Sequence, residues 1–171
     1  MSNETADKWY LIYTKPNQEN RAKENLQNQH FTVFLPMLPY EVKKKVHLEK
    51  MFPRYLFVLL NSQSIDWNKI NSTRGVSYIV TFNKKPAIVS NNIVSSLKKS
   101  CNEDGIFKQI NRLNDYQKGD KVKISKGPLS GYEGIFLLKK AKDRISILMQ
   151  LANREIITEL SFDDLETTLK V

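Results

Sequence analysis

The order of hydrophobic and polar residues in the first hundred positions predicts both strands and helices. Short runs rich in aromatic and β-branched residues are typical of buried strands. Four such runs occur: residues 9–13, 31–36, 55–60 and 77–82. Residues 64–71 and 90–99 have a helical period instead. This mixed order predicts an α+β domain over residues 1–100.

A further helix is expected after the first strand. Asn17 is placed to be its N-cap, and Glu19 suits the first turn, where an acidic side chain interacts favourably with the helix dipole. Ala22 and Leu26 lie four residues apart and form a thin apolar stripe. We therefore expect a helix that mostly faces solvent.

The pattern changes after a polar stretch at residues 101–115, which we interpret as a linker. Residues 116–171 contain several short strands of period two between glycine turns, which predicts a small β-barrel. Residues 145–160, however, contain many good helix formers, with Ile145, Leu148, Ala152 and Ile156 on one face. Periodicity leaves both folds open for this segment.

The charge is concentrated in the first part of the chain. The formal net charge is +9, with a pI of about 9.5. Residues 1–100 hold 15 Lys and Arg against 7 Asp and Glu, whereas the remainder holds 12 against 11. A contact with a polyanion is therefore expected in the first domain. The excess of lysine could instead serve solubility alone.

Catalytic and metal-binding patterns have little support. His30 and His47 lie 17 residues apart without a ligand motif, and Cys101 is the single cysteine. The six glycines form no phosphate-binding loop. We expect no enzyme activity, no metal and no cofactor. The absence of a long apolar run and of a signal peptide predicts a soluble, cytoplasmic protein.

Four segments resemble parts of the NusG family of transcription elongation factors, in the family's order. Residues 9–26, 51–60 and 70–82 resemble its N-terminal NGN domain, and residues 119–136 are similar to its KOW motif. The sequence TRGVS at residues 73–77 and PAIV at 86–89 resemble the RfaH-type, operon-specific antiterminators. The resemblance implies a factor that binds the clamp helices of bacterial RNA polymerase and suppresses pausing and termination.

Two sets of contact residues follow from the resemblance. The apolar surface for the clamp helices corresponds to Tyr13, Phe52, Tyr55, Phe57, Ile79 and Phe82. Some of these side chains could instead be core residues. Contacts with the displaced non-template DNA strand correspond to Lys15, Arg21, Asn25, Thr73 and Arg74. Cations beside hydroxyl groups suit phosphates and base edges, although Lys15 and Arg21 could be ordinary solvated charges.

Two regions depart from the RfaH-type pattern. Asp66, Trp67 and Asn68 replace the family's patch for the opposite pincer of the polymerase, and the hairpin expected around Lys43 to Lys45 is shorter. Asn25 stands where a histidine is usual in these relatives. The base preference and part of the polymerase contact are therefore open.

The resemblance also implies an autoinhibited state, in which a helical C-terminal domain covers the clamp-helix surface. The residues implied in this interdomain contact are Glu49, Ile135, Phe136, Arg144, Leu148 and Leu151. Against this state, Gly131 and Gly134 disfavour its first helix by roughly 1 kcal/mol each relative to alanine.

Alternative functions remain. The chain could be a general NusG factor, or a ribosomal or RNA-binding KOW protein. By resemblance, a released C-terminal barrel would bind a small-subunit ribosomal protein or the terminator Rho. A monomer is expected.

Overall fold

The computed structural model describes residues 7–61, 66–108 and 141–154, and its centre is an antiparallel sheet. The sheet has five strands in the order β2-β5-β1-β6, and β9 also pairs with β1. The longest ladder joins β1 and β5, from Asp7 opposite Asn61 to Tyr13 opposite Tyr55. The strands are β1 (Asp7–Thr14), β2 (Thr32–Phe34), β5 (Tyr55–Asn61), β6 (Val76–Ile79) and β9 (Ile88–Val89).

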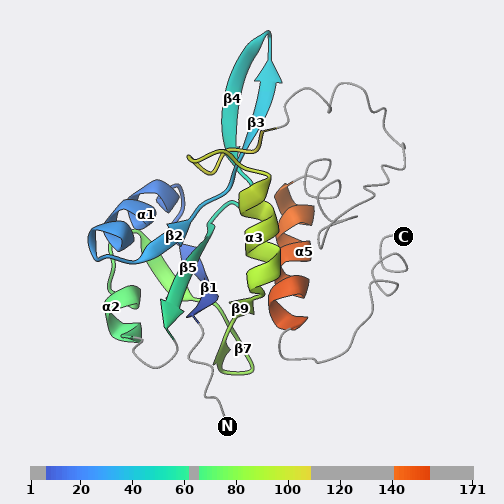
Figure 1. The fold of residues 1–171 in the computed structure, drawn as a ribbon. Helices are drawn as coiled ribbons and strands as arrows, with labels where there is room; N and C mark the ends of the chain where they lie inside the picture. Colours follow the sequence, from blue (N-terminus) through green and yellow to red (C-terminus); the bar gives the residue numbers. More distant parts are fainter. Residues whose placement is uncertain (1–6, 62–65, 109–140, 155–171) are drawn as a thin grey trace.

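Alternation along the strands divides the core into two layers. Trp9 and Leu11 of β1 belong to one buried cluster, and Tyr10 and Ile12 belong to the other. Figure 1 shows helices on both sides of the sheet. The first cluster is covered by α3 (Asn91–Lys99) and α5 (Ala141–Arg154), and the second by α1 (Glu19–Asn28) and α2 (Trp67–Asn71). The predicted α+β class is therefore confirmed.

The helix starts follow local hydrogen-bonding chemistry, with one exception. Asp66 accepts a hydrogen bond from the Lys69 amide at 3.0 Å, and Ser90 caps α3 in the same way. The prediction for α1 was wrong in detail. Its N-cap is Gln18, which makes no side-chain cap, whereas Asn17 has a left-handed φ of 56°. Asn17 belongs to the preceding turn because asparagine tolerates that conformation.

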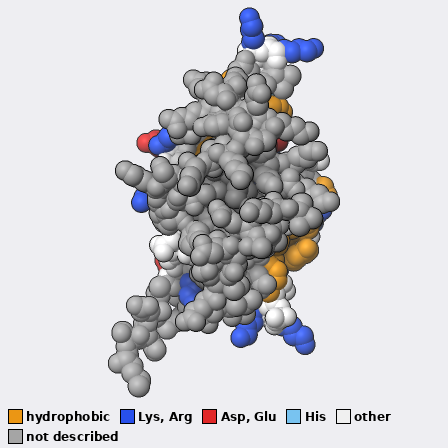
Figure 2. Space-filling model, turned by 90° about the vertical axis from the view of Figure 1, so that its right-hand side faces the viewer, with side chains coloured by type: hydrophobic (Ala, Val, Ile, Leu, Met, Phe, Trp, Pro, Cys, Tyr) orange, Lys and Arg blue, Asp and Glu red, His pale blue; other side chains and the backbone are white. Residues whose placement is uncertain are grey.

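Two hairpins extend from the body. β3 (Met37–Val42) and β4 (Lys45–Lys50) form the longer, and β7 (Thr81–Phe82) and β8 (Lys85–Pro86) form the shorter. Figure 2 shows Lys and Arg side chains at the upper and lower ends of the molecule.

The strand predicted over residues 77–82 is divided between β6 and β7. At the division Val80 donates to the Leu11 carbonyl at 2.9 Å and accepts from the Ala87 amide at 2.8 Å.

The described residues that follow α3 differ from the predicted linker. Residues 101–108 pack on the body, because Cys101 and Phe107 are buried and form a bridge with each other. A second bridge joins Met37 and Ile106. The ordered first domain therefore continues past residue 100.

The C-terminal segment is helical where it is described. α5 covers Ala141–Arg154, so of the two folds left open by the sequence, residues 145–154 adopt the helical one in this structure. Its apolar side chains bury against the sheet, which favours the helix over a separate barrel strand. The predicted barrel strands between residues 116 and 140, together with Ile135 and Phe136, lie outside the described residues.

Candidate functional site

The first candidate surface is the apolar face of the sheet beneath α5, which we call the covered face. It is formed by Trp9, Leu11, Phe52 and Phe57, with Tyr13, Tyr55 and Phe82 packed at its margin. Leu148, Leu151 and Ala152 of α5 are buried in the same cluster, each at most 4% exposed. The side chains of α5 therefore cover this face of the sheet.

Five of the six predicted clamp-helix residues belong to the covered face, and one does not. Phe52 and Phe57 are fully buried, whereas Tyr13, Tyr55 and Phe82 are partly buried. Ile79 packs in the opposite cluster. The reason is register, because Ile79 lies directly opposite Ile12 and paired residues of an antiparallel ladder share a face. The sheet thus separates Ile79 from the aromatic group, which corrects its assignment to that surface.

A row of tyrosines runs along the edge of the covered face. The ring of Tyr13 lies 4.9 Å from the rings of both Tyr55 and Tyr78, and Tyr78 is 50% exposed. Tyr55 and Tyr78 are the residues opposite Tyr13 in the two flanking strands. Burial raises the pKa of the Tyr55 phenol above its ordinary 10.0, and the phenols of Tyr13 and Tyr78 raise it further. Neither the apolar pattern nor the resemblance singled out Tyr78.

Arg54 packs on Tyr13, the central ring of this row. Its guanidinium lies 4.1 Å from the centroid of Tyr13 and donates to the Thr14 carbonyl from Nε at 3.2 Å. Its backbone has a φ of 70°, and its amide donates to the buried carboxylate of Glu19 at 3.0 Å. Glu19 was predicted only as a first-turn acid. Arg54 therefore joins α1, β1 and the start of β5 around the tyrosine row, a role that no local pattern signals.

The contact between Arg144 and Glu49 joins α5 to the base of the long hairpin. Arg144 donates from Nη2 to the Glu49 carboxylate at 2.8 Å and from Nε to the Met51 carbonyl at 2.7 Å. The Arg144 side chain is 4% exposed, whereas that of Glu49 is 45% exposed. A buried guanidinium held by a carboxylate and a carbonyl fixes the position of α5 more than it adds to overall stability.

The second candidate surface is a basic cluster at the junction of α1 and the loop before β6. Lys15, Arg21 and Arg74 are all exposed there. Asn25 donates to the carbonyl of Arg21 at 2.8 Å and to that of Arg74 at 3.3 Å. The amide of Lys15 donates to the Gly75 carbonyl at 2.9 Å. The fold therefore brings together the five predicted DNA-contact positions from three separate segments.

Thr73 differs from its neighbours because it is buried. Its hydroxyl donates to the Lys69 carbonyl at 2.8 Å and accepts from Gln29 at 2.9 Å. Gln29 also donates to the Asn25 carbonyl at 2.9 Å, so these contacts fix the loop against α1. The Thr73 hydroxyl is thus buried and hydrogen-bonded within the protein, whereas the resemblance implies a direct DNA contact at this position. No sequence pattern pointed to this role of Gln29.

Gly75 permits the close approach of this loop to α1. Its φ is 95°, and a Cβ built on it would lie 2.6 Å from the backbone nitrogen of Ala22. Both the conformation and the space therefore require glycine. The neighbouring Arg74 therefore lies on a turn that packs closely against α1.

The segment that departs from the RfaH-type pattern has internal contacts. Asp66 caps α2, and the ring of Trp67 meets that of Tyr10 edge to face at 5.2 Å. Asn68 is exposed. Within residues 7–61, 66–108 and 141–154, no helix is long and apolar enough to span a membrane, and no group of His, Cys, Asp or Glu side chains could hold a metal ion.

Comparison with known families identifies the domain that carries both candidate surfaces. The family model described as "Transcription termination factor nusG" matches residues 7–98, which is more than half of the chain. The chain belongs to the NusG family. NusG family members are factors of transcription termination and antitermination, and the α+β domain described above is their N-terminal domain.

Similar NusG proteins extend over nearly the whole chain. The transcription termination/antitermination protein NusG of Thermus thermophilus is 23% identical, covering 90% of this chain and 95% of its own length. The NusG of Staphylococcus aureus N315 is 24% identical, covering 94% and 96%. A solved structure titled "Domain interaction in Thermotoga maritima NusG" is similar with a TM-score of 0.44 and 21% identity, covering 73% of this chain and 76% of that one.

Proposed function

We propose that this NusG-family protein is an operon-specific antitermination factor that binds the clamp helices of RNA polymerase through the covered face. The observation that carries the proposal is that α5 buries Leu148 and Leu151 against this face. A helix seated on an apolar face uses the same chemistry as an amphipathic partner helix. α5 thus takes the place of the clamp helices until the polymerase or its DNA displaces it.

The basic cluster is proposed to bind the displaced non-template strand. Arg21 is an exposed cation of α1, Arg74 is one on the turn packed against α1, and Lys15 follows directly after β1. Such cations contact phosphates or base edges, and an exposed ring such as Tyr78 offers a stacking surface for an unpaired base. Recognition of a particular DNA element would restrict the factor to a few operons.

Release of α5 is the proposed regulatory step. The ion pair of Arg144 with Glu49 and the apolar contacts of Leu148 and Leu151 have to break together. The freed C-terminal region would then form the KOW barrel expected from the sequence and engage a small-subunit ribosomal protein or Rho. Suppression of pausing and termination would follow from the N-terminal domain on the polymerase.

A general NusG factor is the second candidate, because the similar proteins named above carry that general name. Genome-wide occupancy distinguishes the two functions. Occupancy restricted to a few long operons supports the specialised factor, and even coverage of transcribed genes supports the general one.

The DNA part of the proposal is tested with Arg74→Ala in recruitment to a paused elongation complex. A base-reading arginine predicts a loss of about 1–3 kcal/mol, which is a weakening of roughly 5- to 150-fold. Lys99→Ala is the matched control, because Lys99 is an exposed cation at the end of α3. If both variants weaken recruitment equally on every DNA sequence, Arg74 does not read a base.

A further inference from the structure

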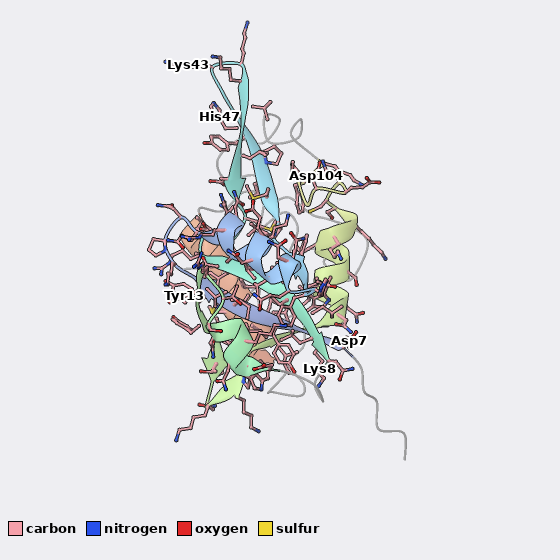
Figure 3. The ribbon with its side chains drawn as sticks, turned by 90° about the vertical axis from the view of Figure 1, so that its left-hand side faces the viewer. Asp7, Lys8, Tyr13, Lys43, His47 and Asp104 are labelled. Carbon is pink, nitrogen blue, oxygen red and sulfur yellow. The ribbon has the colours of Figure 1, made fainter. Side chains whose placement is uncertain are left out.

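The hairpin of β3 and β4, residues 37–50, projects from the body and ends in cations, and we call it the hairpin arm. Figure 3 shows Lys43 at its far end and His47 along its length. Lys43, Lys44 and Lys45 are all exposed. The arm holds four lysines and two glutamates, and one of these glutamates, Glu49, is paired with Arg144. The tip therefore presents a concentrated positive charge away from the basic cluster on α1.

The turn at the tip has lysines in a conformation that disfavours them. Lys43 and Lys44 have φ values of 50° and 63°, both left-handed, as in a two-residue type I′ turn. Side chains with a Cβ are disfavoured in this region, and Asn-Gly is the preferred pair. The turn of the β7–β8 hairpin has Asn83 in its first position. Two cations at the tip of the arm thus replace the residues that the turn favours.

The arm is a regular ribbon that is held firmly at its base. Its ladder runs through six residue pairs, and the rings of Tyr40 and His47 stack across it at 5.4 Å. At the base, the Met37 amide donates to the Gly105 carbonyl at 2.9 Å and its carbonyl accepts from Phe107 at 3.0 Å. The Met51 amide donates to the Pro36 carbonyl at 2.9 Å. The lysines are therefore presented on a stiff support.

We infer that the hairpin arm binds the phosphate backbone of duplex DNA through Lys43, Lys44 and Lys45. The inference rests on the proposed function for the class of partner. A two-stranded ribbon has dimensions that a major groove admits, and lysine binds phosphate as a point charge. Protein interfaces, in contrast, are enriched in Arg and aromatic residues and depleted in Lys. Tyr40, Val46 and Leu48 are exposed on the strands of the arm, but the tip itself carries Lys43, Lys44 and Lys45. The composition of the tip therefore favours nucleic acid over an acidic protein surface.

The test uses the full chain and a labelled blunt DNA duplex of mixed sequence, with binding measured by fluorescence anisotropy over a salt series. The variant Lys43→Asn with Lys44→Gly creates the preferred type I′ pair and removes two cations, so the turn is kept while charge is lost. If two phosphate contacts are lost, the slope of log association constant against log salt concentration should be smaller in magnitude by about 1.8 than that of the wild type. The ratio of wild-type to variant affinity for the duplex should then fall about twelvefold between 50 and 200 mM salt.

The shorter hairpin provides a matched control. Asn83 and Lys84 have left-handed φ values of 48° and 64°, as in the turn of the arm. Lys84→Gly therefore creates an Asn-Gly pair at residues 83 and 84. Duplex affinity and salt slope should match those of the wild type. Thermal unfolding should show both variants at least as stable as the wild type.

Two results would overturn the inference. One is equal duplex affinity and salt slope for the arm variant and the wild type. The other is unchanged duplex binding together with weaker binding to polymerase free of DNA, which would assign the arm to a protein surface. A single-stranded DNA probe with Arg74→Ala tests the proposed function separately. If Arg74→Ala binds the single-stranded probe as tightly as the wild type while the arm variant loses duplex binding as expected, the arm remains a DNA contact and the proposed role of Arg74 on the non-template strand is wrong.

Discussion

The ion pair of Arg144 with Glu49 gives the sharpest prediction about α5. Glu49→Ala removes the carboxylate that lies 2.8 Å from the buried guanidinium and leaves the Met51 carbonyl as an acceptor. A hydrogen bond between charged groups contributes about 1.5–3 kcal/mol when buried. Because Glu49 is 45% exposed, water screens its side of the pair, and we expect about 1–2 kcal/mol. The equilibrium constant for docking of α5 should therefore fall by about 5- to 30-fold.

Amide hydrogen exchange along α5 measures this change directly. In Glu49→Ala the α5 amides should exchange about 5- to 30-fold faster than in the wild type, provided that they exchange through undocking. Glu103→Ala is the matched control, because Glu103 is also an exposed glutamate of the first domain and lies outside the α5 contact. Its α5 protection should equal that of the wild type.

Arg144→Ala extends the same test. It removes the hydrogen bond to the Met51 carbonyl in addition to the ion pair, so its effect should exceed that of Glu49→Ala. Equal protection of α5 in the wild type and both variants would refute the reasoning, because the guanidinium would then contribute nothing to docking. A larger effect of Glu49→Ala than of Arg144→Ala would refute the assignment of the Met51 contact.

Three further predictions concern the core and the loop on α1. Phe57→Ala should lower the free energy of unfolding in urea by about 3–5 kcal/mol, since the ring is fully buried, whereas Tyr78→Ala at a half-exposed site should lower it by less than about 1 kcal/mol. Gly75→Ala should lower the melting temperature by an amount that corresponds to more than about 1 kcal/mol, because the new Cβ meets the Ala22 backbone; an unchanged melting temperature would contradict this. Burial raises the pKa of the Cys101 thiol to about 11 from 9.0. At pH 8 a thiol reagent should therefore modify Cys101 about 100-fold more slowly in the folded protein than in urea. The stability that the protonated thiol contributes is present below pH 9 and should be lost as the pH rises toward 11.

The expected loss of folding free energy in Phe57→Ala changes how a loss of polymerase binding by that variant should be interpreted. The resemblance alone would make Phe57→Ala a test of the apolar surface for the clamp helices. In the structure Phe57 contacts Phe34 and Phe52 at ring distances of 5.8 and 6.0 Å. A loss of binding in Phe57→Ala would therefore report damage to the core. Tyr55 and Tyr78 at the margin give cleaner tests of a surface contact.

Local pattern predicted most of the elements but not their exact geometry. The apolar runs located β1 and β5, and the helical period located α3. The face of Ile79 could not be predicted, because the register of β6 shifts at an irregularity beside Tyr13 and the strand ends before Val80. Residues 145–154 have an apolar pattern that suits either a helix or a strand, and the contact of α5 with the covered face decides between them.

The candidate site depended on long-range contacts that sequence pattern does not contain. Resemblance suggested Glu49 and Arg144, which are 95 positions apart and form an ion pair in the structure. Arg54 and Gln29 were missed because their roles arise from packing against distant segments. Thr73 was predicted as a surface contact because its burial beneath Gln29 has no local signature.

In the proposed mechanism, α5 and the polymerase clamp helices compete for the covered face. The most direct measurement is amide hydrogen exchange of α5 in the full chain, alone and bound to a polymerase elongation complex. We predict that the α5 amides are protected in the free protein and lose this protection on binding. Retained protection of α5 in the bound protein would contradict the account, because the face beneath Leu148 and Leu151 would then stay closed.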